Sequence, residues 1–171
     1  MRIMYNMLMR ILGVDPGIGR LGWGVIEVEG QKQKAIAYGC IETSMKTTEE
    51  KRIQEIFHEL QKILIQTKPD VLAVEELFFS RNVTTAFSVG QARGVVLLAA
   101  AEAGIPLASY YPTAVKSAVT GYGKADKVQI GQMVKAILKL ESLPKLDDTT
   151  DALAVALTHA FTAKFKRIKS L

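Results

Sequence analysis

The segment ILGVDPGIGRLGWGVIE (residues 11–27) predicts the start of a β-sheet, because two apolar, strand-like runs flank a turn that is rich in glycine. The first strand is predicted over residues 9–14 and the second over 23–28, and a third run, AIAYGCI, follows at 35–41. Glycine-containing turns separate these runs at short spacing, which indicates an antiparallel meander.

After the meander, the chain alternates helical patterns with short strands. Apolar residues recur at helical spacing over 48–66, and Thr47 and Glu50 have the spacing of a capping box at the start of that helix. VLAV (71–74) is a short buried strand, and a crossover through helix 48–66 would let it lie parallel beside strand 9–14. The remaining expected elements are a helix over 84–103, a strand over 107–111, a helix from Pro112, a helix over about 125–140 and a final helix over about 148–165. This order predicts an α/β fold with a five-stranded mixed sheet flanked by helices.

Length and composition limit the class of protein. The 171 residues suit a single domain over 1–171, with residues 1–8 either an extension before the first strand or an upstream start. The net charge of +5 is compatible with a nucleic-acid partner. We expect no secretory signal, and the sequence contains no apolar run of the roughly 18 residues that a membrane span needs. With one cysteine, Cys40, no disulfide framework exists, so we expect a cytoplasmic protein with no membrane partner.

Acidic residues stand where three of the predicted elements begin or end. They are Asp15 after the first strand, Glu75 and Glu76 after strand 71–74, and Asp147, Asp148 and Asp151 at the start of the final helix. The carboxyl ends of parallel strands meet at one edge of a sheet, where ligand sites form. An unpaired buried carboxylate is costly, and oxygen ligands select hard cations such as Mg²⁺ or Mn²⁺. The pattern therefore predicts a metal site, and two such ions could support phosphodiester hydrolysis.

Each group of acids also has an ordinary structural interpretation. Asp15-Pro16-Gly17 could be a turn after a strand, Glu75-Glu76 an exposed strand end, and acids in the first turn of a helix cap its free N–H groups. Asp151 fits capping least well, because the helix after it is apolar on all sides and therefore buried. Spacing alone leaves open the choice between Glu75 and Glu76, and between Asp147 and Asp148.

Four segments resemble the RuvC family of Holliday junction endonucleases, within the ribonuclease H-like superfamily. They are ILGVDPGIGRLGWGVIE (11–27), PDVLAVEELFFSRNVTTAFSVGQARGV (69–95), TAVKSAVTGYGKADKVQI (113–130) and DDTTDALAVALTH (147–159). The resemblance covers residues 9–162 in family order, and GQARG after the acid-and-phenylalanine strand end is its most distinctive part.

The resemblance implies roles for individual residues. Its four catalytic acids and metal ligands match Asp15, Glu75, Asp148 and Asp151, which would hold Mg²⁺ or Mn²⁺, with two ions in each active site. Phe78 matches an aromatic residue used against unpaired bases at the crossover, although core packing is an equally good explanation of that side chain. Lys116 and Lys127 match residues implicated in junction binding, and Lys124 and Arg81 are further candidates for phosphate contacts.

The resemblance also implies the reaction and the partners. The expected activity is symmetric, Mg²⁺-dependent nicking of two opposed strands of a four-way DNA junction during recombination and repair. A homodimer suits the twofold symmetry of the junction, and a branch-migration motor complex is the expected partner. The helix over 84–103 could form the dimer contact or simply be buried. The alternatives are a ribonuclease H-like nuclease that acts on structured RNA and a non-catalytic junction-binding scaffold.

Overall fold

The structure is a computed structural model that describes residues 8–76 and 83–169, with side chains described over 8–76 and 86–163. Its elements in chain order are β1 (Met9–Asp15), β2 (Arg20–Glu29), β3 (Lys32–Glu42), α1 (Glu49–Thr67), β4 (Val71–Glu75), α2 (Val83–Glu102), β5 (Leu107–Tyr110), α3 (Pro112–Thr120), α4 (Lys127–Leu138) and α5 (Asp147–Lys169). In this part of the chain, no helix is both long enough and apolar enough to cross a membrane.

The five strands form one mixed sheet in the order β3-β2-β1-β4-β5. β1, β2 and β3 are an antiparallel meander, whereas β4 and β5 run parallel to β1. α1 is the crossover that returns the chain to the middle of the sheet, so that Val14 of β1 lies beside Val74 of β4. The predicted fold class and the predicted parallel pairing of the first and fourth strands are both confirmed.

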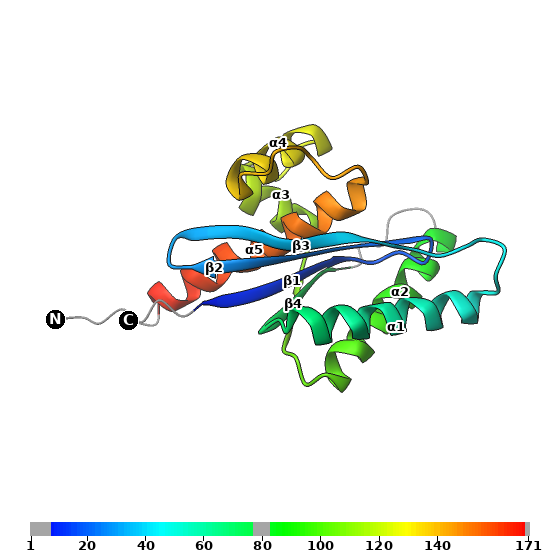
Figure 1. The fold of residues 1–171 in the computed structure, drawn as a ribbon. Helices are drawn as coiled ribbons and strands as arrows, with labels where there is room; N and C mark the ends of the chain where they lie inside the picture. Colours follow the sequence, from blue (N-terminus) through cyan, green and yellow to red (C-terminus); the bar gives the residue numbers. More distant parts are fainter. Residues whose placement is uncertain (1–7, 77–82, 170–171) are drawn as a thin grey trace.

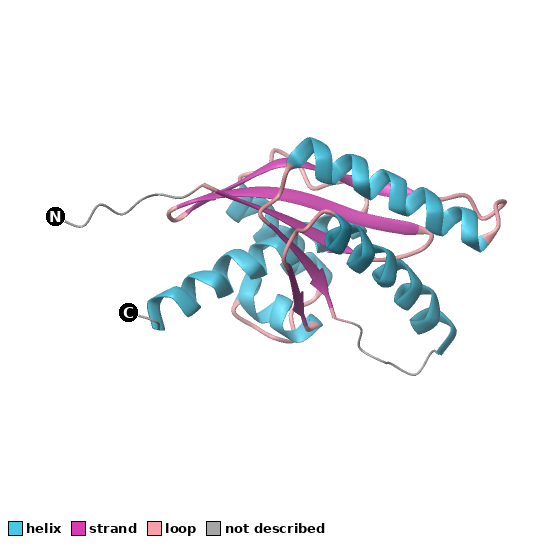
Figure 2. Cartoon of the chain, turned by 90° about the horizontal axis from the view of Figure 1, so that it is seen from below, coloured by secondary structure: helices cyan, strands magenta, loops and turns pink. Residues whose placement is uncertain are grey.

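Helices cover both faces of the sheet (Figures 1 and 2). α3, α4 and α5 pack on one face, where Ile11 contributes to the core, and α1 and α2 pack on the other face, where its neighbour Leu12 is buried. Successive side chains of a strand point to opposite faces, and both faces of β1 are covered. This arrangement explains why its central residues are apolar without interruption.

Two glycines let α5 lie directly against the sheet. A Cβ atom added to Gly13 of β1 would collide with the backbone oxygen of Ala152, and one added to Gly22 of β2 would collide with that of Asp148. Glycine in a strand often marks such a close approach of another backbone. The first two turns of α5 are therefore held against the ends of β1 and β2, and this contact positions the acids of the helix.

The start of α1 differs from the predicted capping box. The N-cap residue is Thr48, and its hydroxyl donates to the Glu50 carboxylate (2.6 Å) without making a side-chain cap. The Thr47 hydroxyl donates to the Ser44 carbonyl oxygen (2.8 Å) in the preceding turn. The prediction was wrong because the helix begins one residue later than the spacing suggested. A complete capping box occurs at α4, between Asp126 and a glutamine three residues on.

Candidate active site

Acids from three elements meet at one edge of the sheet. Asp15 is the last residue of β1 and Glu75 is the last residue of β4, its parallel neighbour. Asp148 and Asp151 lie in the first two turns of α5, which contacts β2 at Gly22, the residue paired with Asp15. The structure thus brings together the four acids that the resemblance singled out, and their catalytic role remains a prediction.

Asp15 lies at the centre of this acidic cluster. Burial, together with the negative charges of Asp151, Glu75 and Asp148, raises the pKa of its carboxyl from 3.8 to about 8, and the positive charge of Lys127 opposes this shift. Loss of hydration and nearby like charges both disfavour the ionised form of a carboxyl group. Because Asp15 responds to all three of the other acids, the four groups behave as one electrostatic site.

Two lysines place positive charge beside the acids. Burial and the charge of Asp151 raise the pKa of Glu75, whereas Lys116 and Lys127 lower it. Lys127 Nζ lies 3.2 Å from Asp151 Oδ2. Burial raises the pKa of Asp151, and the positive charge of Lys127 opposes that rise. In return, the negative charge of Asp151 raises the pKa of Lys127. α3 and α4 each therefore supply a cation to this edge of the sheet.

The structure separates the pairs of acids that sequence spacing could not. Glu76 lies 3.4 Å from Nη2 of Arg93, on α2 at the opposite face of the sheet, and Arg93 Nη2 also donates to the Ser109 hydroxyl (3.1 Å). Glu75 is instead the acid whose charge acts on Asp15. On α5, Asp147 is exposed, whereas Asp148 is half-buried within the cluster. The geometry therefore agrees with the choice of Glu75 and Asp148.

Arg20 was not singled out from the sequence. It begins β2, and its Nε atom lies 3.5 Å from Asp148 Oδ2. The available signal was its place in the turn five residues after Asp15, but an arginine at the end of a turn is usually a solvated surface residue. Its contact with α5 depends on the close approach at Gly22, which the sequence pattern alone did not reveal.

The donor set suits a hard divalent cation, since all four side chains offer carboxylate oxygens. Within residues 8–76 and 86–163, however, no three carboxylate, imidazole or thiol groups are arranged to hold a metal ion. Two of the four acids form ion pairs instead, Asp148 with Arg20 and Asp151 with Lys127.

Of the three remaining predicted DNA contacts, the structure describes one, and the role of all three stays a prediction. Lys124 is exposed in the loop between α3 and α4. Phe78 and Arg81 lie outside the described residues, so the expectations for them stay predictions.

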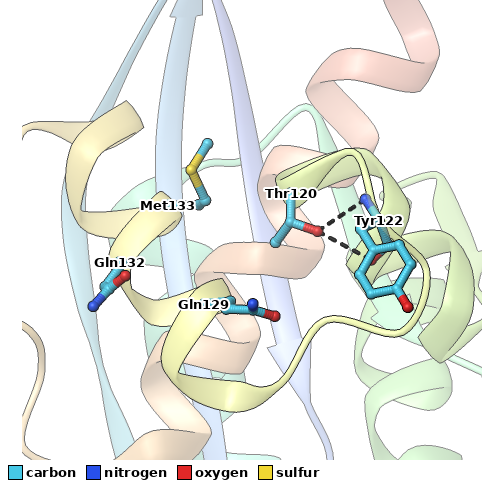
Figure 3. Close-up of a pocket in the computed structure, with 5 residues that line it drawn as sticks. All are labelled: Thr120, Tyr122, Gln129, Gln132 and Met133. Atoms are coloured by element: carbon cyan, nitrogen blue, oxygen red, sulfur yellow. Dashed lines mark hydrogen bonds between the residues drawn. The ribbon is translucent and has the colours of Figure 1, made fainter.

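A pocket of about 250 Å³ is present at α3 and α4 (Figure 3). It lies between the end of α3 and the first half of α4 and is lined by Thr120, Tyr122, Gln129, Gln132 and Met133. The Thr120 hydroxyl lies 3.1 Å and 3.0 Å from the backbone nitrogen and oxygen of Tyr122, and 2.8 Å from the Lys116 carbonyl oxygen. The hydroxyl thus ties the loop between the helices to the turn of α3 that carries Lys116.

Comparisons with known proteins identify close relatives. The family model for crossover junction endodeoxyribonuclease RuvC matches residues 11–159. The chain is 53% identical over 156 residues to the RuvC of Heliobacterium modesticaldum, covering 90% of this chain and 96% of the relative. It is 51% identical over 152 residues to the RuvC of Brevibacillus brevis, covering 89% of this chain and 92% of that relative.

Solved structures give the same result. The chain resembles Thermus thermophilus RuvC with a TM-score of 0.86 and 41% identity, over 92% of this chain and 97% of the other. For T. thermophilus RuvC in complex with a Holliday junction substrate, the TM-score is 0.88 and the sequence identity is 40%. This match covers 92% of this chain and 96% of the other. A yeast mitochondrial Holliday junction resolvase, at a TM-score of 0.67 and 13% identity, shares the fold. On this evidence, the chain belongs to the RuvC family of crossover junction endodeoxyribonucleases.

Proposed function

We propose that this nuclease resolves Holliday junctions through hydrolysis at a site formed by Asp15, Glu75, Asp148 and Asp151. The observation that carries the proposal is the convergence of these four acids around a partly buried Asp15. A relative that is 40% identical over 92% of this chain was solved with a Holliday junction substrate, which supports a four-way DNA junction as the substrate here.

The four carboxylates would hold a divalent cation, with Mg²⁺ as the expected ion, Mn²⁺ as a substitute and two ions in each site. When bound, such ions stabilise charge on the attacking and leaving oxygens of an in-line phosphoryl displacement. The acids themselves fix where the ions bind relative to the DNA backbone. In the free protein, the ion pairs of Lys127 and Arg20 partly offset the repulsion between these acids.

The lysines beside the acids would bind the phosphates of the junction. Lys116 and Lys127 both affect the pKa of Glu75, so a phosphate held by either lysine would lie next to the acids. Lys124 would extend this basic flank along the loop between α3 and α4. Phosphate contacts of this kind position DNA without reading its sequence. Phe78 and Arg81 would also contact the junction, Phe78 by stacking on an unpaired base.

A homodimer would present two such sites to opposed strands of one junction. Phe87 and Leu98 support α2 as the contact, because they leave 67% and 52% of their surface exposed on this helix.

A branch-migration motor complex would deliver the junction, and the cytoplasm would be the site of action.

The test is a mobile synthetic four-way junction, labelled on each arm in turn and incubated with and without Mg²⁺. The expected result is paired nicks at symmetric positions in two opposed strands, with ends that a ligase can reseal, and no cutting in EDTA. Linear duplex DNA and structured RNA are the controls. Preferential cutting of the RNA would favour a different ribonuclease H-like activity, and junction binding without Mg²⁺-dependent cutting would favour a scaffold.

A further inference from the structure

The turn after Asp15 needs a restraint that the acids themselves cannot supply. The negative charges of three other carboxylates act on Asp15, and like charges in a partly buried site repel one another strongly. Its strand ends there, and the chain turns through residues 16–19 before β2 begins. Whatever fixes this turn also fixes the backbone from which the Asp15 carboxylate projects.

Thr43 makes two hydrogen bonds to that turn. It follows the last residue of β3 and is 8% exposed. Its hydroxyl donates to the carbonyl oxygen of Ile18, and its backbone N–H donates to the carbonyl oxygen of Gly19 (3.1 Å). Two consecutive carbonyl groups of the turn are therefore bound to one buried residue that directly follows β3.

Arg52 completes the arrangement from α1. Its Nε atom donates to the Thr43 hydroxyl oxygen (2.9 Å), so this hydroxyl both donates and accepts. An added Cβ at Gly19 would lie 3.5 Å from Arg52 Nη2, which places the guanidinium group against the turn. A hydroxyl with both partners in place has its orientation fixed. The chain thus connects α1 to the turn beside Asp15 through one side chain.

The turn is held on its other side as well. Arg20, the first residue after the turn, forms the ion pair with Asp148 of α5. The segment that follows Asp15 is therefore held between helices on opposite faces of the sheet. The ion pair belongs to the acidic site already described, whereas Thr43 and Arg52 lie outside it.

We infer that Thr43 and Arg52 are positioning residues, which hold the turn after Asp15 so that its carboxylate stays beside the other three acids of the proposed site. The inference rests on the proposed function, because it gives the two residues a purpose at that site. Groups that orient metal ligands typically change metal affinity or activity about 10- to 100-fold when they are removed. Neither residue needs to contact DNA or metal to have this effect.

The decisive comparison is Thr43→Val with Thr43→Ser in the full chain. Valine keeps the shape and loses the hydroxyl, so that the Ile18 carbonyl and Arg52 Nε lose their partner, whereas serine keeps both bonds. For Thr43→Val we expect about 10-fold weaker Mg²⁺ binding to the DNA-free protein by calorimetry and a similar rise in the Mg²⁺ concentration needed for half-maximal cutting. Thr43→Ser should stay near the wild type, and Arg52→Met should resemble the valine variant, with Lys51→Met as its control on the exposed side of α1.

Hydrogen exchange of a peptide spanning residues 15–22 provides a readout that needs neither metal nor substrate. Exchange should be faster in Thr43→Val than in Thr43→Ser or the wild type. Equal exchange and equal Mg²⁺ affinity in the two threonine variants would overturn the inference. If the wild type neither bound Mg²⁺ nor cut junctions, the proposed function would fail, while the exchange comparison would still report whether Thr43 holds the turn.

Discussion

Asp151 is the acid with the clearest test of a catalytic role, because it combines burial with a direct cation contact at Lys127. Asp151→Asn keeps the shape of the side chain and removes its charge. We expect normal junction binding in a gel-shift assay and cutting reduced by roughly 100-fold or more, since charge on a metal ligand is lost. Asp147→Asn, which alters the exposed acid one helical turn earlier, is the matched control and should cut nearly normally. Loss of junction binding by Asp151→Asn would instead make this residue structural.

Asp15 makes the metal-free stability depend on pH. Its pKa is about 8 in the folded protein, compared with an ordinary value of 3.8. The unfolded chain therefore releases this proton at lower pH than the folded protein does, so the contribution of Asp15 to stability is greatest below about pH 4 and declines as pH rises toward 8. Asp15→Asn should remove this decline.

The measurement is thermal unfolding of both proteins in EDTA at several pH values. The Tm of Asp15→Asn should exceed that of the wild type by more at pH 8 than at pH 5, by roughly 2–4 °C for each kcal/mol of repulsion relieved. Added Mg²⁺ should raise the Tm of the wild type at pH 8 and have little effect on the variant. If the Tm values of the two proteins changed equally with pH in EDTA, ionisation of Asp15 would not destabilise the folded protein.

At the scale of elements, the close packing of α5 on β2 is the contact that assembles the site. Gly22→Ala would place a Cβ against the Asp148 backbone, and overpacking of this kind costs about 1–3 kcal/mol. We expect a lower Tm and a loss of cutting larger than the loss of stability explains, because α5 carries two of the four acids. Gly94→Ala is the control, since an added Cβ there meets nothing within 4 Å and alanine favours a helix. Equal cutting by both variants would show that the α5–β2 distance is not critical.

The sequence predicted the elements better than their contacts. Strands and helices were predicted because apolar residues repeat with a period that reports local backbone geometry, as in strand 71–74. The capping box at Thr47 was wrong because the same spacing allows the helix to start one residue later. Arg20 and Thr43 were missed because each acts across the fold, on α5 and on the turn after Asp15. Such contacts depend on tertiary structure, which local patterns do not encode.

At the scale of the whole molecule, the proposed dimer links two active sites to one junction. Leu98 lies on α2 with 52% of its surface exposed, and charge at an apolar contact disfavours association. Leu98→Glu should therefore be a folded monomer by light scattering, with each active site intact. Met45→Glu is the control, because Met45 is 87% exposed in the loop between β3 and α1.

The consequence for cutting can be read from a supercoiled plasmid that extrudes a four-way cruciform. Two nicks made within one binding event linearise such a plasmid. A single nick instead releases the supercoiling, so that the cruciform returns to ordinary duplex before a second cut can be made. The wild type should therefore yield mainly linear plasmid and Leu98→Glu mainly nicked circles, in proportion to the monomer fraction. Linear product from a fully monomeric variant would mean that one site cuts both strands in turn, and the twofold argument for the dimer would no longer hold.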